Sequence, residues 1–432
     1  MSSHLLRRRS ATAAWVYIAV ALAIVATIVA ARVLGLAQFG VFATALAVVG
    51  FFQALLDLTV EESLTKYGFR YVEAGDWGRL RRLFRQMLVL KLVGGALATG
   101  ILLVLAPFAD QLFGEDGVGA ALLAASLLPL VQSSENVGAT ALLLHGRYDL
   151  RGAYQAASAG LRLVAVALCA PHGVTATLVG IVLAQFAATI VISLAGLSAI
   201  RRFPSAPVRP LAEDVAGIRS FVLQSSIATG VVSVRTTLVP IVLGLVAGPT
   251  QVGLFRVAQT PQTGLAAASS PARLVLMTEQ TRDWERGERS RVLAVVASYT
   301  RWAGALMLVA VPVFFVAMPA LVRVVFGSEY EGAVDAARIV LFAAGIYFTI
   351  GWTKSLPVTV GRPRLRILTH GLETLVAIPL VAVLGTEWGA TGAAVAVLVS
   401  AVVFAAAWLV VLARLRGEVA DAERARGAAF QP

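Results

Sequence analysis

The sequence predicts an all-α polytopic membrane protein, with twelve transmembrane helices in two parallel six-helix repeats and with both termini in the cytoplasm. Three observations predict this fold class. The composition is too apolar for a soluble protein, the apolar residues fall into twelve runs of spanning length, and short motifs of the first half recur in the second half.

Composition separates the chain from soluble proteins and from nucleic-acid-binding proteins. Of its 432 residues, 58% are hydrophobic and 14% are charged, whereas soluble domains have about 45–50% apolar and about 25% charged residues. The net charge of +12 lies in short segments between apolar runs. No basic stripe with interleaved aromatic residues accompanies it, so we expect no nucleic-acid partner.

Residues that usually carry catalysis or bind metals are sparse. Cys169 is the single cysteine, which excludes a disulfide framework. The four histidines are scattered rather than clustered: His4, His145, His172 and His370. The chain shows no zinc-type ligand cluster, no nucleophile with its base and no paired-carboxylate motif. The sequence therefore predicts no enzyme, no cofactor and no metal site.

The apolar runs define the predicted helices in order. The first follows Arg7–Arg9 and is longer than the ~7–15-residue core of a signal peptide, so we expect it to span the membrane. The twelve runs lie at about 11–31, 40–61, 87–108, 118–144, 152–171, 174–200, 219–246, 251–276, 292–321, 333–353, 366–384 and 389–412. They predict an N-lobe (1–200), a cytoplasmic linker (201–218), a C-lobe (219–413) and a cytoplasmic tail (414–432).

Motifs recur at an offset close to half the chain length. The sequence Gln-Phe-Gly-Val-Phe at 38–42 returns as Gln-Val-Gly-Leu-Phe at 251–255, 213 positions later. Three further echoes follow in the same order, with offsets of 213 to 216: 113–114 with 326–327, 146–151 with 361–366, and 173–175 with 389–391. This order indicates an ancient duplication. Because six helices return the chain to its starting side, the repeats should be parallel.

The positive charges orient the predicted bundle. Segments on the side of the N-terminus contain 28 Lys and Arg residues, whereas the opposite loops contain only Arg32 and Arg323. Since Lys and Arg concentrate in cytoplasmic loops, we expect both termini and the linker in the cytoplasm, and the protein in the cell inner (cytoplasmic) membrane.

Several cations lie inside the predicted spans, where an Arg costs ~2.5–3.5 kcal/mol on insertion scales. They are Lys91, Arg162, Arg235, Arg256, Arg301 and Arg338. Lys91 lies near the cytoplasmic end of its helix, from which it can snorkel. At about 1.5 Å per residue, Arg162 and Arg301 should lie ~15 Å deep, near the midplane. Arg235 and Arg256 should occupy the outer half.

Two interpretations of these cations are open. In the first, each cation is neutralised by an intramembrane acid. The acids available are Asp57, Glu135, Asp335 and Glu373. The i,i+3 spacing of Asp335 and Arg338 predicts a local ion pair. In the second interpretation, several of the arginines form a substrate site.

The duplication favours the substrate site. At the local offsets, the positions equivalent to three of the arginines are apolar: Arg162, Arg235 and Arg256 correspond to Ala377, Leu22 and Ala43. Packing alone gives symmetric positions no reason to differ in this way, so the broken symmetry indicates a function for the charges.

One short motif remains without a firm assignment. Residues 75–79 read Gly-Asp-Trp-Gly-Arg, which partly resembles a cytoplasmic loop motif of major facilitator transporters. Trp77 stands where that motif has Arg, and the remaining spacing fits poorly, so we assign no function to it.

Two turns resemble those of a known family. Residues 32–45 resemble the first-loop pattern of the polysaccharide transporter family (Wzx-type oligosaccharide flippases), in which an apolar-Leu-Gly turn leads to Phe-Gly-apolar-Phe/Tyr. The stretch 56–58 is similar to the family's Leu-Asp-Leu-Gly segment, with Thr59 in place of Gly, and 244–258 is similar to its turn between helices seven and eight. Arg235 replaces an acidic residue that is common in helix seven of the family.

This resemblance implies a fold and a function. The family belongs to the multidrug/oligosaccharidyl-lipid/polysaccharide flippase superfamily, which implies two six-helix lobes around a central cavity. It also implies alternating-access export of a polyprenyl-pyrophosphate-linked oligosaccharide for cell-surface polysaccharide biosynthesis. The buried cations fit this function, because Arg offers planar bidentate donors to phosphate oxygens. The expected pyrophosphate ligands are Arg162, Arg235, Arg256 and Arg301, and the candidates for coupling or gating are Asp57, Glu135 and Glu373.

Other functions remain as alternatives. A multidrug or cation exporter of the same superfamily would need a carboxylate-lined cavity, and the intramembrane arginines argue against a cationic cargo. A flippase for a lipid-linked peptidoglycan precursor fits the same fold. A membrane scaffold that transports nothing leaves the buried charges unexplained. Membrane lipids are expected partners, as are a glycan polymerase or glycosyltransferases.

Overall fold

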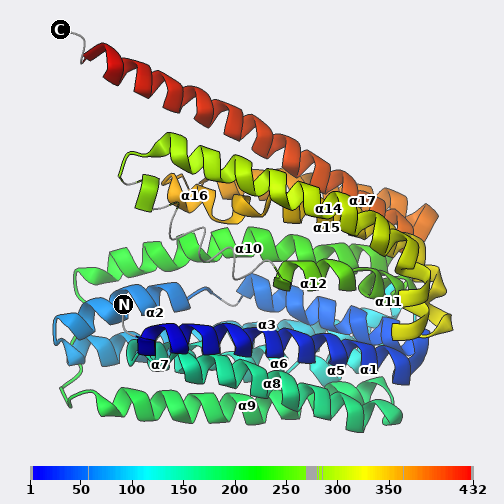
Figure 1. Ribbon diagram of the computed structural model, residues 1–432. Helices are drawn as coiled ribbons and strands as arrows, with labels where there is room; N and C mark the ends of the chain where they lie inside the picture. The colour runs from blue at the N-terminus through cyan, green and yellow to red at the C-terminus, as the bar shows by residue number, and fades with distance from the viewer. Residues whose placement is uncertain are drawn as a thin grey trace. The chain divides into compact units, whose positions relative to one another are not determined.

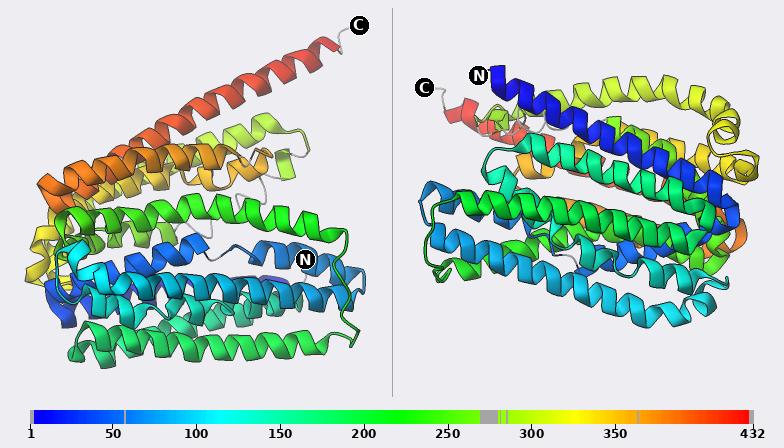
Figure 2. Two further views of the ribbon diagram at one scale, coloured as in Figure 1. Left: turned by 180° about the vertical axis from the view of Figure 1, so that it is seen from behind. Right: turned by 90° about the horizontal axis from the view of Figure 1, so that it is seen from below.

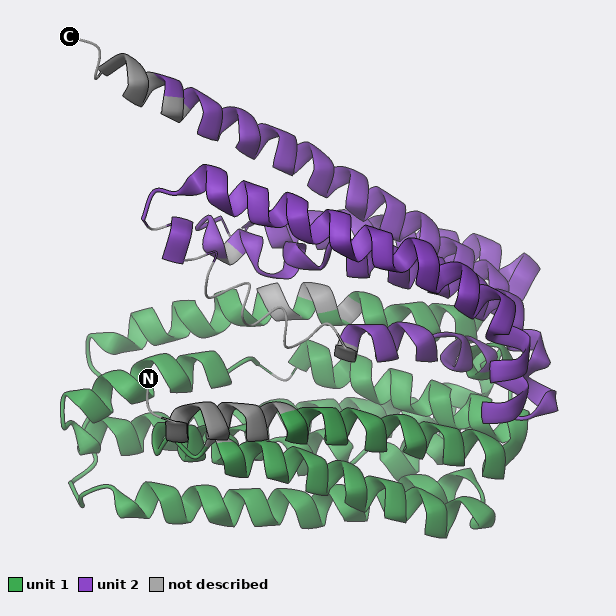
Figure 3. Ribbon diagram, viewed as in Figure 1, with its two compact units in different colours: residues 1–253 green, residues 254–432 purple. Residues whose placement is uncertain are grey.

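The computed structural model describes residues 3–56, 58–268, 280, 282–284, 286–362 and 364–429 (Figure 1). These residues form helices joined by short turns, and no strand occurs among them. The chain divides into two compact units, residues 1–253 and residues 254–432 (Figure 3).

Unit 1 contains ten α-helices and the beginning of an eleventh within its described residues, and its long helices lie side by side (Figures 1 and 2). In chain order these are α1 (Ser3–Leu56), α2 (Glu61–Glu73), α3 (Trp77–Leu105), α4 (Ala109–Phe113), α5 (Val118–Ala125), α6 (Leu128–Gln132), α7 (Glu135–Leu144), α8 (Tyr148–Cys169), α9 (Val174–Arg202), α10 (Asp214–Ala247) and the first part of α11 (Pro249–Ala258), with short 3₁₀ turns η1 (Ala106–Phe108) and η2 (Ala170–His172).

Unit 2 contains the rest of α11 and the later helices. Its described elements are α12 (Thr260–Ala268), α14 (Arg289–Val325), η3 (Ser328–Ala333), α15 (Val334–Thr349), η4 (Gly351–Lys354), α16 (Leu356–Thr359) and α17 (Arg364–Ala429). An aromatic core holds α14, η4 and α17 together, in which Trp352 and Trp408 are each 1% exposed and their rings meet edge to face.

Eight helical segments in the described part of the chain are long and apolar enough to cross a membrane. They are Ala14–Leu56, Trp77–Phe113, Val118–Leu144, Asp149–His172, Val174–Arg202, Arg289–Val325, Ser328–Thr349 and Arg364–Asp421. The longest two contain non-helical residues, Gly35 and Gly389, at which the helix axis turns. This shows a multi-pass, all-helical membrane protein, while the count of twelve spans, the two repeats and the cytoplasmic termini stay predictions.

The echoes found in the sequence fall on glycines with left-handed backbone. Gly35 has φ 72° and ψ 169°, and Gly248 in the equivalent turn has φ 85° and ψ 164°. The same sign of φ recurs in the other three echoes, at Gly114 and Gly327, Gly146 and Gly361, and Gly173 and Gly389. Residues with a Cβ rarely adopt this conformation. The recurring sequence motifs therefore mark recurring turns of the backbone.

A fifth pair of turns escaped the sequence comparison. Gly75 and Gly287 also have positive φ and lie 212 positions apart. Each is followed by an acidic residue just before a long helix. Asp76 accepts a hydrogen bond from the backbone N–H of Arg79 (3.0 Å), and Glu288 pairs with the guanidinium of Arg291 (2.9 Å). The neighbouring residues differ between the two turns, which hid the relationship.

One predicted span is interrupted. The run 118–144 was expected as a single helix, but the structure divides it into α5, α6 and α7. At each break a serine hydroxyl donates to a backbone carbonyl three residues earlier, Ser126 to Leu123 and Ser133 to Leu130 (both 2.7 Å). Such bonds compete with the helical hydrogen bonds, and Pro129 at the start of α6 removes a donor. The hydropathy of the run 118–144 does not indicate these breaks in the helix.

The motif at 75–79 docks the segment that connects α9 to α10, which crosses one end of unit 1 (Figure 2). Trp77 stacks on Phe203 with ring centroids 5.2 Å apart. A Cβ on Gly78 would lie 2.4 Å from the carbonyl oxygen of Pro207, so only glycine permits this approach. The backbone N–H of Arg209 donates to the carbonyl of Gly78 (3.3 Å). The motif therefore has a structural role in this fold.

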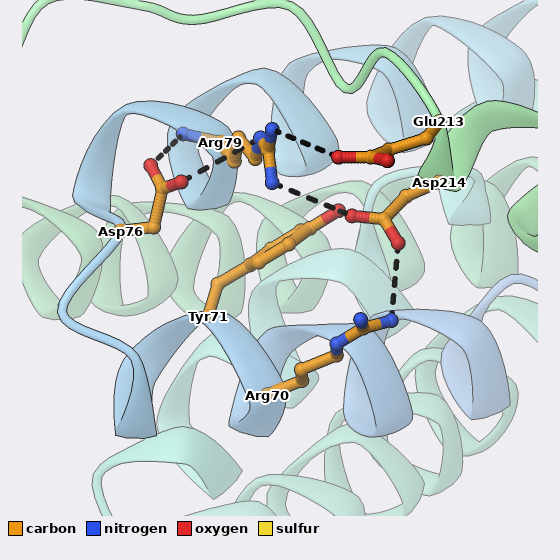
Figure 4. A network of polar contacts seen from close by, with 6 residues as sticks. All are labelled: Arg70, Tyr71, Asp76, Arg79, Glu213 and Asp214. Carbon is orange, nitrogen blue, oxygen red and sulfur yellow. Dashed lines mark hydrogen bonds and ion pairs between the residues drawn. The ribbon is translucent and has the colours of Figure 1, made fainter.

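Asp214, the first residue of α10, is the centre of a polar network on the same surface (Figure 4). Arg70 donates to its Oδ1 (3.0 Å), and the Tyr71 hydroxyl donates to its Oδ2 (2.9 Å). Arg79 lies 3.8 Å from the same carboxylate. Burial and the hydrogen bond to Asp214 raise the pKa of Tyr71 above its ordinary value, which keeps the hydroxyl protonated.

Candidate functional site

A cavity of about 480 Å³ with several polar side chains in its lining lies within unit 1. Its size is that of a typical ligand pocket. One wall is a face of α8 with i, i+3, i+4, i+7 spacing: Gln155, Ser158, Ala159 and Arg162. A second wall is an apolar face of α1 with the same spacing: Val16, Ala19, Val20 and Ala23. Five further residues line the cavity from α1, α6, α7 and α9: Gln53, Gln132, Glu135, Asn136 and Gln185.

Gln185 joins the two charged residues of this cavity. Its Oε1 accepts from Nη2 of Arg162 (3.1 Å), and its Nε2 donates to Oε2 of Glu135 (2.9 Å). Nε2 also donates to the hydroxyl of Thr189 (3.2 Å). Gln185 is 3% exposed, so this buried amide holds the cation and the carboxylate in fixed positions without letting them touch.

The guanidinium of Arg162 has N–H donors that remain available to a ligand. Among the residues that the structure describes, Gln185 is its one hydrogen-bond partner, and Arg162 itself lines the cavity. An Arg carries five N–H donors in a planar fork. Several of them therefore remain for oxygen atoms of a bound molecule.

A second cavity of about 300 Å³ shares Gln53 with the first. Between the two, Gln53 donates to the side-chain carbonyl of Gln132. The second cavity is lined by Lys91, whose ammonium lies 3.3 Å from Glu61. Lys91 is 1% exposed, so the expectation that it snorkels was wrong. Glu61 at the start of α2 supplies a counter-charge that the sequence spacing did not indicate.

The remaining predicted ligands lie elsewhere. Arg235 is half-buried on α10 and lines neither of these two cavities. Arg256 on α11 and Arg301 on α14 are exposed residues of unit 2, and neither makes a hydrogen bond or ion pair with any described residue. Asp57 lies outside the described residues. The structure thus brings Arg162 and Glu135 together, and the four-arginine site stays a proposal.

Glu373 belongs to a closed cluster in unit 2. Its side chain is fully buried and accepts a hydrogen bond from the hydroxyl of Tyr347. Nδ1 of His370 lies 2.9 Å from its other oxygen, and the His370 ring stacks on Phe404 with centroids 4.8 Å apart. The carboxylate is therefore held in place by Tyr347 and His370.

The local ion pair predicted in unit 2 is confirmed. Nη1 of Arg338 lies 3.4 Å from Asp335, one turn away on α15. The same guanidinium lies 4.6 Å from the centre of the Phe315 ring, and its Nε donates to the Phe315 carbonyl (3.2 Å). These contacts give Arg338 a structural role.

The amides of the site were not among the predicted site residues. Gln53, Gln132 and Gln185 carry no charge and match no motif, so a search for acids and bases passes over them. A usable signal was present, since an amide inside an apolar run is costly in a membrane unless it finds a partner.

Comparison with known proteins gives one family match and several structural neighbours. A family described as "Polysaccharide biosynthesis protein" matches residues 5–271. Inner membrane protein YghQ of Escherichia coli (strain K12) is 33% identical over 131 residues, which cover 29% of this chain and 34% of YghQ. The matched part thus spans about a third of that relative.

Two solved structures share the fold over nearly the full chain. A multidrug resistance MATE family transporter of the MOP superfamily, in an inward-facing conformation, superposes with a TM-score of 0.67 at 14% identity, over 92% of this chain and 96% of that one. The lipid II flippase MurJ, in an inward closed conformation, gives a TM-score of 0.73 at 10% identity, over 93% and 87%. At these identities the likeness concerns the fold alone.

Proposed function

Because this chain belongs to the polysaccharide biosynthesis protein family, we propose that it flips a polyprenyl-pyrophosphate-linked oligosaccharide across the cytoplasmic membrane by alternating access. The observation that carries the proposal is the unit 1 cavity, in which Arg162 presents unused N–H donors beside amide side chains. An anionic, hydroxyl-rich head group needs such donors when it leaves water.

The pyrophosphate is the part of the substrate that most needs protein partners. We propose that Arg162, Arg235, Arg256 and Arg301 bind it in turn during transport. The absence of ion pairs at Arg256 and Arg301 within the described residues supports this role, because a cation bound to an acid would have to exchange partners first. Dividing the binding among several sites keeps any one of them from trapping the substrate.

Coupling and gating are assigned to the acids. The contact of Glu135 with Gln185 supports this role, because a change at the carboxylate can reach Arg162 through that amide. Glu373 and Asp57 are proposed for the same role. Membrane lipids would solvate the polyprenyl tail, and a glycan polymerase or glycosyltransferases would act before and after flipping.

The test is a flipping assay in proteoliposomes. The probe is a polyprenyl-pyrophosphate-linked oligosaccharide that carries a fluorophore on its glycan, and a membrane-impermeant quencher reports the outer leaflet. Wild-type protein should accelerate equilibration of the probe between leaflets, and Arg162→Lys should slow it. Arg201→Lys, at the exposed end of α9, is the matched control and should behave like wild type. Equilibration no faster than in protein-free vesicles would overturn the proposal.

A multidrug or cation exporter of the same superfamily is a second candidate, because Glu135 lines the cavity. The nearby guanidinium of Arg162 opposes a cationic cargo. The same vesicles loaded with a fluorescent organic cation separate the candidates: efflux that is lost in Glu135→Gln supports the exporter. A lipid-linked peptidoglycan precursor as the probe tests the third candidate.

A further inference from the structure

We infer that the unit 1 cavity is a subsite for an uncharged sugar unit of the substrate, bound next to the pyrophosphate. The inference rests on the proposed function, and it deepens that function by assigning glycan recognition to named residues. Four features of the cavity point to it: its charge balance, its unpartnered amides, its two unlike walls, and the closure of the corresponding face in unit 2.

The cavity is balanced in charge. Arg162 and Glu135 both line it, and Gln185 holds the guanidinium and the carboxylate through two hydrogen bonds of 3.1 and 2.9 Å. A ligand that fills the whole cavity therefore meets one formal charge of each sign. This arrangement favours a neutral group with both donors and acceptors over a second anion.

Two amides of the cavity have no hydrogen-bond partner among the described residues. Asn136 and Gln155 line it, and neither makes a hydrogen bond to another described residue. A carboxamide offers an acceptor and two donors in one plane, which matches the hydroxyl and acetamido groups of a sugar. Polar groups in a membrane interior require partners. A sugar unit would supply them during transport.

The two walls suit the two aspects of a sugar ring. The α8 face from Gln155 to Arg162 is polar, and it extends ~10 Å along the helix axis at about 1.5 Å per residue. The α1 face of Val16, Ala19 and Val20 is apolar. A sugar has a polar rim and C–H faces, so it can satisfy both walls. Arg162 at one end of the polar wall is placed for the phosphate to which the sugar is attached.

The corresponding face in unit 2 is closed. At the local offset of 215, the α8 residues Gln155, Ser158, Ala159 and Arg162 correspond to His370, Glu373, Thr374 and Ala377. There Glu373 is fully buried and is held by His370 and Tyr347, and Ala377 is also fully buried. The face that forms a cavity in unit 1 is thus filled by its own side chains in unit 2, and we assign the sugar subsite to unit 1.

The experiment compares two probes that differ only in the sugar. One is a polyprenyl pyrophosphate that carries a single N-acetylhexosamine, and the other is the same polyprenyl pyrophosphate without it. Binding of each to purified protein in lipid nanodiscs is measured for wild type, Gln155→Ala, Asn136→Ala and Arg162→Lys. Gln224→Ala is the matched control, because Gln224 is an exposed amide on α10 that contacts Ser220. Thermal unfolding confirms that each variant is folded.

The inference predicts a selective loss. Gln155→Ala and Asn136→Ala should each weaken binding of the sugar-bearing probe roughly fivefold to tenfold, as expected for lost hydrogen bonds, and should leave the sugar-free probe unchanged. Arg162→Lys should weaken both probes, and Gln224→Ala should weaken neither. If wild type binds both probes and the two amide variants affect them equally or not at all, the sugar subsite is wrong while the proposed function stands. If wild type binds neither probe, the proposed function falls and the subsite with it.

Discussion

Gly40 and Gly253 pack directly against each other in unit 1. A Cβ on Gly253 would lie 3.1 Å from the Cα of Gly40, and a Cβ on Gly40 would lie 2.3 Å from the carbonyl oxygen of Pro249. These glycines are also equivalent positions of the recurring motif, 213 residues apart. The recurring motif therefore meets its own echo at a place where the two backbones can approach this closely only through glycine.

Replacing Gly40 by Ala should destabilise the protein. The added methyl group would overlap the backbone of Pro249 and Thr250, which cannot rotate away, and overpacking of this kind costs about 1–3 kcal/mol. Thermal unfolding in detergent should show a lower midpoint. Gly100→Ala is the control, because nothing lies within 4 Å of a Cβ there, and it should match or exceed wild type. Equal midpoints for the two variants would contradict the close contact.

Crosslinking near this contact should stop transport if the lobes rock. The turns at Gly35 and Gly248 are proposed to lie at an outer gate, which must open to release the glycan. We expect Gln38→Cys/Gln251→Cys, joined by a short thiol crosslinker, to lose flipping. The background is Cys169→Ala, which removes the native thiol. Each single-cysteine variant treated in the same way should keep its activity. Undiminished flipping in the crosslinked double variant would count against rocking.

Arg301→Lys should impair flipping without unfolding the protein. The charge survives, but the planar fork that binds two phosphate oxygens does not. Since Arg301 is exposed and unpaired among the described residues, its replacement should leave the unfolding midpoint unchanged. Initial flipping rates should fall about tenfold or more, the effect of losing one hydrogen bond to a charged group. A variant that flips at the wild-type rate would remove Arg301 from the proposed site.

The Asp214 network should make stability depend on pH through Tyr71. Burial and the hydrogen bond to Asp214 raise the pKa of Tyr71 above its unfolded value of 10.0. A raised pKa stabilises the fold fully below pH 10, and this contribution is lost as pH rises towards the folded pKa. Below pH 10, Tyr71→Phe should therefore be less stable than wild type by about 0.5–1.5 kcal/mol.

The difference between wild type and Tyr71→Phe should shrink as pH rises above 10. Unfolding midpoints of both proteins between pH 8 and pH 11 test this. Tyr17→Phe is the control, because Tyr17 on α1 is 39% exposed. Its unfolding midpoint should match that of wild type at every pH. If the two unfolding midpoints differ by the same amount from pH 8 to pH 11, ionisation of the Tyr71 hydroxyl does not affect stability.

The predicted orientation in the membrane rests on the distribution of Lys and Arg, with 28 on the side of the N-terminus and 2 in the opposite loops. Reporter fusions at Arg209 and at the C-terminal tail should be active in a cytoplasmic assay, and fusions next to Glu115 and Glu329 should be active in an assay for the opposite side. A cytoplasmic signal at Glu115 would reverse the predicted orientation.

Much of this protein could be predicted from local properties. Hydropathy over some twenty residues identifies a span regardless of the rest of the chain, and the multi-pass helical fold was confirmed. The glycines of the echoes were found for the same reason, because a left-handed turn at Gly35 or Gly248 requires glycine at that position. The helix breaks at Ser126 and Ser133 were not found, because a serine that bonds back to its own helix has no distinctive spacing.

The sequence by itself determined the membrane class, the turn glycines and the presence of Arg162 and Glu135 in apolar helices, since these depend on residues close together in the chain. Only the tertiary structure decided which side chains meet. Gln185 reaches both charges because α7, α8 and α9 pack together, and Lys91 finds Glu61 because α2 folds back on α3. These contacts join residues 23 to 50 positions apart, and no local pattern encodes the way helices pack in three dimensions.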